Sequence, residues 1–196
     1  EKRSYYLMSL DDKIKNILKK QKILPIINTI NLDEDLKKID NLISQKKNIQ
    51  CLEITLRNKN SLNIAKEIKN NFPNITIGLG SITNVKQFEE VIDYQFDFFV
   101  SPGIIEEIIN LNAKNYIPGA ESISEFNFLL NNNIKIIKFF PAIISGGVKK
   151  LNSIASIFKE LNFIPTGGIN ESNVHSFLEL QNVLCVGTSK FDDLIS

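Results

Sequence analysis

Lys138 stands near the C-terminal end of an apolar segment, IKIIKFF (134–140), that has the composition of a buried β-strand. Side chains alternate along a strand, so Lys138 shares a face with Ile136 and Phe140. Burial among apolar groups disfavours an ammonium and favours the neutral amine, which is the form that attacks a carbonyl. The segment predicts a Schiff-base lysine; the alternative is a lysine that reaches the rim or pairs with a structural carboxylate.

A second apolar segment, CLEITLR (51–57), carries Glu53 and Arg57 on one face, opposite a face made of Leu52, Ile54 and Leu56. Formation of a Schiff base moves protons at the amine, carbinolamine and imine stages, and a nearby carboxylate can move them. We therefore predict that Glu53 serves Lys138 and that Arg57 faces the same interior. The alternative is a purely structural ion pair between Glu53 and Lys138.

Glycines follow the last two apolar segments, in PTGGI (165–169) and GTS (187–189). Glycine allows backbone N–H groups to approach a phosphate closely, and loops after the seventh and eighth strands of a parallel barrel commonly bind one. Either pair alone could be a tight turn. Together they predict a phosphate site, whereas Gly146 and Gly147 are expected to shape the loop beside Lys138.

The single histidine, His175, lies in a helical pattern away from any strand end, and we expect it on the surface or in helix packing. His and Cys residues nowhere have the spacing of a metal site. The sequence predicts chemistry without a metal and without a cofactor.

The elements that would position these residues alternate between strands and helices. Apolar segments recur at 23–27, 51–56, 75–80, 96–100, 116–120, 134–140, 163–168 and 183–187. Helical periodicity is present at 32–43, 61–72, 84–94 and 148–161. Eight strands with crossover helices predict an α/β protein with the (β/α)8 TIM barrel fold, and an open parallel sheet is the alternative.

Residues 10–22 are expected to form a helix over the N-terminal mouth of the barrel. The helices after 96–100 and 116–120 should be short or poorly amphipathic, and only SKFDDLIS (189–196) remains for a shortened C-terminal helix. Linker-like tracts are absent, so residues 1–196 are expected to form one domain.

The composition excludes several classes of partner. The 23 Lys and Arg residues balance 22 Asp and Glu, so no global field favours nucleic acid or an anionic membrane. No apolar stretch approaches the roughly 20 residues that cross a bilayer. The two cysteines lie in apolar segments and no signal peptide is evident, so we expect a soluble cytoplasmic protein.

Read in order, the segments LEITLR, GLGS, VSPG, IPGA, KFFPA, PTGGI and VLCVG resemble the 2-keto-3-deoxy-6-phosphogluconate (KDPG) and 4-hydroxy-2-oxoglutarate aldolase family, from Leu24 to Ser189. The resemblance implies a class I aldolase on a (β/α)8 barrel, usually a homotrimer, that needs no cofactor. Its implied substrate is a small phosphorylated 2-oxo acid, cleaved to pyruvate and glyceraldehyde 3-phosphate. Cleavage of 4-hydroxy-2-oxoglutarate to pyruvate and glyoxylate is a second implied activity.

The resemblance also implies roles for individual residues. Lys138 of KFFPA would form the Schiff base, and Glu53 of LEITLR would be the catalytic acid and base. Arg57 and the Ser81 hydroxyl would bind the substrate carboxylate. Pro102 and Phe140 would line the pocket. The implied phosphate site comprises Thr166, Gly167, Gly168, Gly187, Thr188 and Ser189.

Four departures from the family pattern bear on the substrate. Ser81 stands where Thr is usual, Asn28 where many members have Arg, and Ile143 where Glu is common, and GTSK replaces a more glycine-rich turn. The reaction is therefore better indicated than the substrate. Two alternatives stay open: another phosphate-binding barrel enzyme, such as an isomerase or decarboxylase, and a non-catalytic ligand-binding protein on a decayed aldolase barrel.

Overall fold

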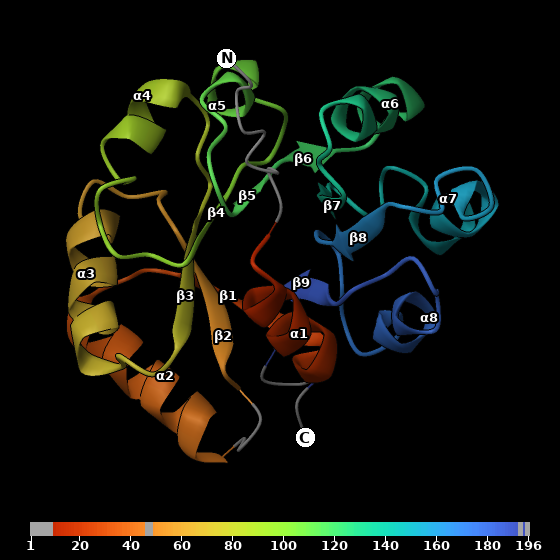
Figure 1. Cartoon of the computed structure of the whole chain (residues 1–196). Helices are drawn as coiled ribbons and strands as arrows, with labels where there is room; N and C mark the ends of the chain where they lie inside the picture. The colour runs from red at the N-terminus through yellow and green to blue at the C-terminus, as the bar shows by residue number, and fades with distance from the viewer. Residues whose placement is uncertain (1–9, 46–48, 192–193, 195–196) are drawn as a thin grey trace.

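The computed structural model describes residues 10–45, 49–191 and 194, in which strands and helices alternate along the chain (Figure 1). The strands are β1 (Ile23–Asn28), β2 (Cys51–Thr55), β3 (Thr76–Gly80), β4 (Phe98–Val100), β5 (Tyr116–Ile117), β6 (Gly119–Ala120), β7 (Ile136–Phe139), β8 (Asn162–Pro165) and β9 (Val186–Thr188). The helices are α1 (Asp12–Gln21), α2 (Leu32–Gln45), α3 (Ser61–Asn71), α4 (Val85–Glu89), α5 (Glu106–Asn110), α6 (Ile123–Asn131), α7 (Gly147–Ile154) and α8 (Val174–Leu178).

The strands form two curled parallel sheets. One has the order β5-β4-β3-β2-β1-β9 and the other the order β6-β7-β8. They separate between β5 and β6 at Pro118, which has no N–H to donate to a ladder. Two isolated parallel bridges, Phe163 with Val183 and Thr166 with Gly187, join the β8 segment to the chain around β9. The α/β class and the parallel sheet are confirmed, and closure into a complete (β/α)8 barrel stays a prediction.

Two apolar clusters lie on opposite faces of the strands, as the alternation along each strand requires. Ile137 and Phe139 of β7 belong to the larger cluster, which packs beneath the outer helices, whereas Ile136 belongs to the smaller inner cluster. The same division places Leu52 and Ile54 outside and Cys51 inside. The face assignments made from the sequence for these two strands are therefore confirmed.

Helix α1 packs against the inner cluster, as predicted for residues 10–22. Its residues Ile14 and Leu18 are buried there, and Leu18 is 0% exposed. Gln21 ties the end of the helix to the start of β2, because its side chain accepts from Cys51 N at 2.9 Å and donates to Cys51 O at 2.7 Å. The Asp11 side chain caps the helix through Lys13 N. Helix α1 thus covers the N-terminal side of the inner cluster.

The remaining helices lie outside the strands, with α2 and α3 beside β1 to β3 and α6 to α8 beside β7 and β8 (Figure 1). Two differ from their predicted ranges: the 84–94 pattern is helical only to Glu89, and the 148–161 pattern only to Ile154. Helix α5 is short, as expected. Helix α6 runs for nine residues, and a capping box of Ser122 and Glu125 satisfies its first N–H groups.

Half of the predicted C-terminal helix at 189–196 lies outside the described residues, which include only 189–191 and 194 of that range. Within the part of the chain that the structure describes, no helix has both the length and the apolar character needed to span a membrane.

We expect Leu18→Ala to lower the free energy of unfolding by about 2–5 kcal/mol, the range for removing a fully buried leucine from a core. Chemical denaturation measures this change. Lys19→Ala, at an exposed position on the same helix, is the matched control and should leave stability almost unchanged. Equal stability of the two variants would show that α1 does not complete the inner core.

Candidate active site

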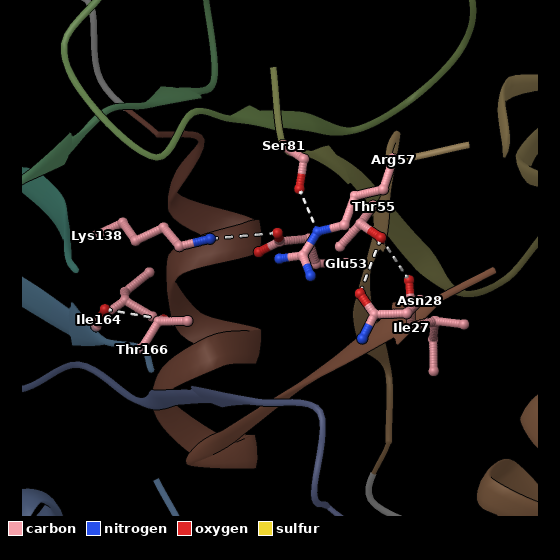
Figure 2. Close-up of polar contacts among 9 residues, drawn as sticks. All are labelled: Ile27, Asn28, Glu53, Thr55, Arg57, Ser81, Lys138, Ile164 and Thr166. Carbon is pink, nitrogen blue, oxygen red and sulfur yellow. Dashed lines mark hydrogen bonds and ion pairs between the residues drawn. The ribbon is translucent and has the colours of Figure 1, made fainter. Parts of the chain in front are cut away.

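The centre of the site is an ion pair between two strands that are 85 residues apart in sequence. Lys138 Nζ of β7 lies 3.4 Å from Glu53 Oε1 of β2. Both residues are buried, with exposed fractions of 8% and 1%. The two side chains extend toward one another across the space between their strands (Figure 2). The structure thus brings together the two residues that the sequence predicted to react.

The carboxylate of Glu53 occupies space that only a glycine leaves free. A Cβ atom added at Gly80, the last residue of β3, would lie 1.9 Å from Glu53 Oε1 and 2.5 Å from Glu53 Cδ. These distances are far below van der Waals contact, so Gly80 is required for the observed position of Glu53. The sequence interpretation missed this role, although a glycine within a strand often marks such a close approach of another group.

Arg57 and Ser81 lie beside the ion pair (Figure 2). Arg57 Nε donates a hydrogen bond to Ser81 Oγ at 3.2 Å. Ser81 has φ of 64°, in the left-handed region that non-glycine residues seldom adopt and that recurs at functional sites. The guanidinium and the hydroxyl, which were predicted to bind one carboxylate together, are therefore neighbours.

A chain of hydroxyl groups shapes the loop that contains Pro102. Ser101 Oγ donates to Gly103 O, so the 2.6 Å contact between the Ser101 and Tyr116 hydroxyls has Tyr116 as its donor. Ile105 N in turn donates to the Tyr116 oxygen. Burial raises the pKa of Tyr116 in spite of these hydrogen bonds, which keeps its phenol protonated. The network sets the path of the loop on both sides of Pro102.

A cavity of about 180 Å³ opens at the C-terminal ends of β1, β8 and β9. Arg57 and Phe140 line it, and the Phe140 ring centroid lies 5.4 Å from Lys138 Nζ. All six residues predicted to bind phosphate also line this cavity: Thr166, Gly167, Gly168, Gly187, Thr188 and Ser189. The cavity is therefore adjacent to the ion pair and contains the whole predicted phosphate site.

Lys138, Glu53, Ser81 and Pro102 are not among the described residues that line this cavity. For Pro102, the structure gives a different contact: its carbonyl lies against Gly119, where a Cβ atom would be 2.1 Å away. Gly119 is the β6 partner of Lys138. The placement of Pro102 in the substrate pocket stays a prediction.

Close packing accounts for the glycines of the two loops. Gly167 and Gly168 have φ of 97° and 81°, and a Cβ atom at Gly168 would lie 2.6 Å from Ile143 Cγ1. A Cβ atom at Gly187 would lie 2.4 Å from Thr166 Oγ1. The loops therefore lie close to one another and to Ile143, the residue that departs from the family pattern.

Three polar lining residues were not predicted as ligand contacts: Asn28, Asn170 and Lys190. Asn28 had been noted only as a departure, and its Oδ1 accepts a hydrogen bond from Thr55 Oγ1 at 3.1 Å. Lys190 could have been found from its place directly after the glycine turn, where a side chain can reach the same ligand as the loop.

Other nucleophiles are held away from this chemistry. Burial raises the pKa of Cys51 well above its ordinary value, and neighbouring Cys185 raises it further. Burial, with a smaller contribution from the charge of Glu53, likewise raises the pKa of Cys185. Both thiols thus stay protonated and unreactive. His175 is exposed on α8, and the described residues contain no group of three or more His, Cys, Asp or Glu side chains that could hold a metal ion.

Comparison with known proteins places this geometry in a family. The sequence model described as aldolase, KDPG and KHG aldolase, matches residues 14–195, which is nearly the whole chain. The chain belongs to the KDPG and KHG aldolase family. KHG is 4-hydroxy-2-oxoglutarate, so the family includes both of the activities that the sequence motifs implied.

Individual members of this aldolase family agree with that assignment. The KHG/KDPG aldolase of Escherichia coli is 32% identical over 177 residues, which cover 89% of this chain and 82% of the relative. The 2-dehydro-3-deoxy-phosphogluconate aldolase of Pseudoalteromonas atlantica is 40% identical over 144 residues, covering 72% of this chain and 67% of the relative. The crystal structure of KDPG aldolase from Legionella pneumophila, with pyruvate captured as a covalent carbinolamine, superposes with a TM-score of 0.83 at 32% identity, covering 89% of this chain and 85% of that one.

We expect Gly80→Ala to displace the Glu53 carboxylate and to lower kcat for aldol cleavage by about 10²-fold or more, the usual effect of losing a general acid-base group. Glu53→Gln should have a loss of similar size. Because both changes act on one group, the double variant should be little worse than either single variant. Steady-state kinetics measure all three.

Gly103→Ala is the matched control, because a Cβ atom at Gly103 meets no atom within 4 Å. It should retain its activity. If the fold-loss of kcat in the double variant equalled the product of the two single losses, the effects of Gly80→Ala and Glu53→Gln would not have a common origin.

Proposed function

We propose that this chain is a class I aldolase that cleaves KDPG to pyruvate and glyceraldehyde 3-phosphate. The observation that carries the proposal is the buried contact between Lys138 Nζ and Glu53 Oε1 beside a cavity lined by glycine-rich loops. The names of the relatives support it, as does the carbinolamine of pyruvate in the Legionella pneumophila enzyme.

The first half of the reaction forms the Schiff base. Glu53 takes a proton from Lys138, and the neutral amine attacks C2 of the substrate to give a carbinolamine. Glu53 then returns a proton to the departing hydroxyl, which leaves as water, and the nitrogen lone pair forms the C=N bond. The 3.4 Å separation of Nζ and Oε1 suits this exchange, because such contacts are often long before substrate binds.

The second half breaks the carbon–carbon bond. Glu53 removes the proton of the C4 hydroxyl, the C3–C4 electron pair moves into the iminium group, and glyceraldehyde 3-phosphate leaves. Glu53, which now carries the proton of the C4 hydroxyl, protonates the resulting enamine at C3. Water then attacks the imine carbon, and hydrolysis releases pyruvate and regenerates Lys138. The residues of this chain supply every proton-transfer group that these reaction steps require.

The ends of the substrate are held by the groups on either side of the ion pair. Arg57, together with the Ser81 hydroxyl, binds the carboxylate next to C2. The phosphate occupies the cavity, where backbone N–H groups of the Gly167–Gly168 and Gly187–Ser189 turns approach it. Phe140 and Pro102 line the path between these two ends.

A second candidate substrate is 4-hydroxy-2-oxoglutarate, which would be cleaved to pyruvate and glyoxylate. The family is described by both substrates, and the Escherichia coli relative is named for both. The same Lys138 and Glu53 steps apply, because both substrates have a carbonyl at C2 and a hydroxyl at C4. They differ in the anion at the far end, which is a phosphate in KDPG and a carboxylate in 4-hydroxy-2-oxoglutarate. The preference between them therefore depends on which anion the cavity binds better.

The alternatives from the sequence make different use of the same residues. An isomerase or decarboxylase would use the phosphate loops without an imine, and a decayed aldolase barrel would bind without reacting. Neither explains why a lysine and a carboxylate are both buried at this end of the strands. Removing such a pair from water costs free energy that its contribution to stability seldom offsets.

Three finer features are part of the proposal. The two curled sheets close into one (β/α)8 barrel, supported by the bridges at Phe163 and Thr166. The protein is cytoplasmic and forms a homotrimer; the side chains of Ile143 and Ile144, which are 44% and 87% exposed, offer an apolar surface for contact between copies. Light scattering on the purified protein should give a mass near three times 22.2 kDa. A monomeric mass would contradict the trimer.

We expect borohydride reduction in the presence of pyruvate to attach a covalent adduct to Lys138, because the imine forms there. Peptide mapping by mass spectrometry locates the adduct. Lys138→Met should remove the adduct and reduce aldol cleavage to background, whereas Lys135→Met, at an exposed position on the same segment, should retain both. An adduct on another lysine, or none in the native protein, would contradict the mechanism.

A further inference from the structure

We propose that Lys190 supplies a side-chain cation to the phosphate end of the active-site cavity and thereby favours phosphorylated over unphosphorylated substrates. This inference rests on the proposed function, because it assigns a specificity residue to the same site. Lys190 follows directly after β9 and lines the same cavity as the Gly167–Gly168 loop.

The charges around the cavity are all of one sign. Arg57 and Lys190 are its two cationic lining residues, and no Asp or Glu is among the described residues that line it. The chain as a whole has a formal charge of only +1, so this is a local concentration of positive charge. A concave site lined by one sign of charge attracts the opposite sign, and a phosphate dianion is the matching ligand.

The two cations serve different parts of the site. Arg57 is hydrogen-bonded to Ser81 Oγ on the side of the Lys138–Glu53 pair. Lys190 lies on the segment after β9 and lines the cavity together with the Gly167–Gly168 loop that follows β8. A substrate with a carboxylate at one end and a phosphate at the other has two anions for these two cations. The unphosphorylated hydroxy-oxo acid has no phosphate dianion for Lys190.

Of the polar groups of Lys190, its side-chain ammonium is the one that is free to bind the phosphate, because its backbone N–H is already hydrogen-bonded. Its backbone N–H donates to Thr188 Oγ1 at 3.0 Å, and Thr188 Oγ1 itself donates to Ile169 O at 3.1 Å. The Thr188 hydroxyl is thus engaged with the loop after β8, and the Lys190 N–H is engaged within its own turn. They hold the main chain at Lys190 in place, while its exposed side chain has no ion-pair partner among the described residues.

The test compares kcat/KM for KDPG and for 4-hydroxy-2-oxoglutarate in Lys190→Gln, Lys190→Arg and the native protein. Lys190→Gln removes the charge and keeps the backbone N–H. It should lower the ratio of the two kcat/KM values about tenfold, which is the size of one charge-assisted contact. Lys190→Arg should restore most of that ratio. Lys149→Gln, at an exposed position on α7, is the matched control and should leave the ratio unchanged.

A binding measurement keeps the proposal independent of turnover. Inorganic phosphate is titrated into each protein at low ionic strength, and calorimetry measures the heat of binding. The dissociation constant for phosphate should be several-fold larger in Lys190→Gln than in the native protein. Added salt should reduce this difference. An unchanged substrate ratio together with an unchanged phosphate constant would overturn the proposal. A parallel fall for both substrates would also overturn it, because Lys190 would then only shape the loop.

Loss of the aldolase function and loss of the Lys190 role would give different experimental results. If the native protein gives no borohydride adduct with pyruvate, the proposed aldolase function fails, whatever Lys190 does. If the adduct forms equally in native protein and Lys190→Gln while the substrate ratio and phosphate binding do not change, the aldolase stands and only the role of Lys190 is wrong.

Discussion

The buried pair of Lys138 and Glu53 is the interaction to which the rest of the site is fitted. Two charges removed from water are tolerated only when they lie close together, and here Nζ and Oε1 are 3.4 Å apart between the inner faces of β7 and β2. Gly80 on β3 leaves room for the carboxylate, and Phe140 places its ring near the ammonium. The strands therefore act as rigid supports, and their register decides whether the two groups meet.

The inner core separates this polar end from the opposite end of the strands. Helix α1 closes the N-terminal side with Ile14 and Leu18, and the inner cluster fills the space between. The cavity beside the pair lies on the other, C-terminal side. The same division is typical of parallel α/β enzymes, in which one end of the strands provides stability and the other provides chemistry.

Much of this arrangement could be predicted from single residues. The alternation in IKIIKFF and CLEITLR placed Lys138 and Glu53 on inner faces, because a strand has only two faces. The clearance at Gly80 and the left-handed backbone of Ser81 could not be predicted, since both depend on how three strands lie side by side. Helices α4 and α7 end before their apolar pattern does, because tertiary packing overrides local periodicity. The family resemblance implied the phosphate loop residues but not Lys190, which the structure places in the lining of the same cavity.

The two cysteines have a practical consequence. Cys51 and Cys185 are both 0% exposed within the inner cluster, and burial raises the pKa of each thiol. An alkylating reagent can react with them only when the strands separate enough to admit it. The native chain thus contains an intrinsic reporter of sheet opening, and the rate of thiol labelling measures how often the strands separate, without an added fluorophore or an engineered site.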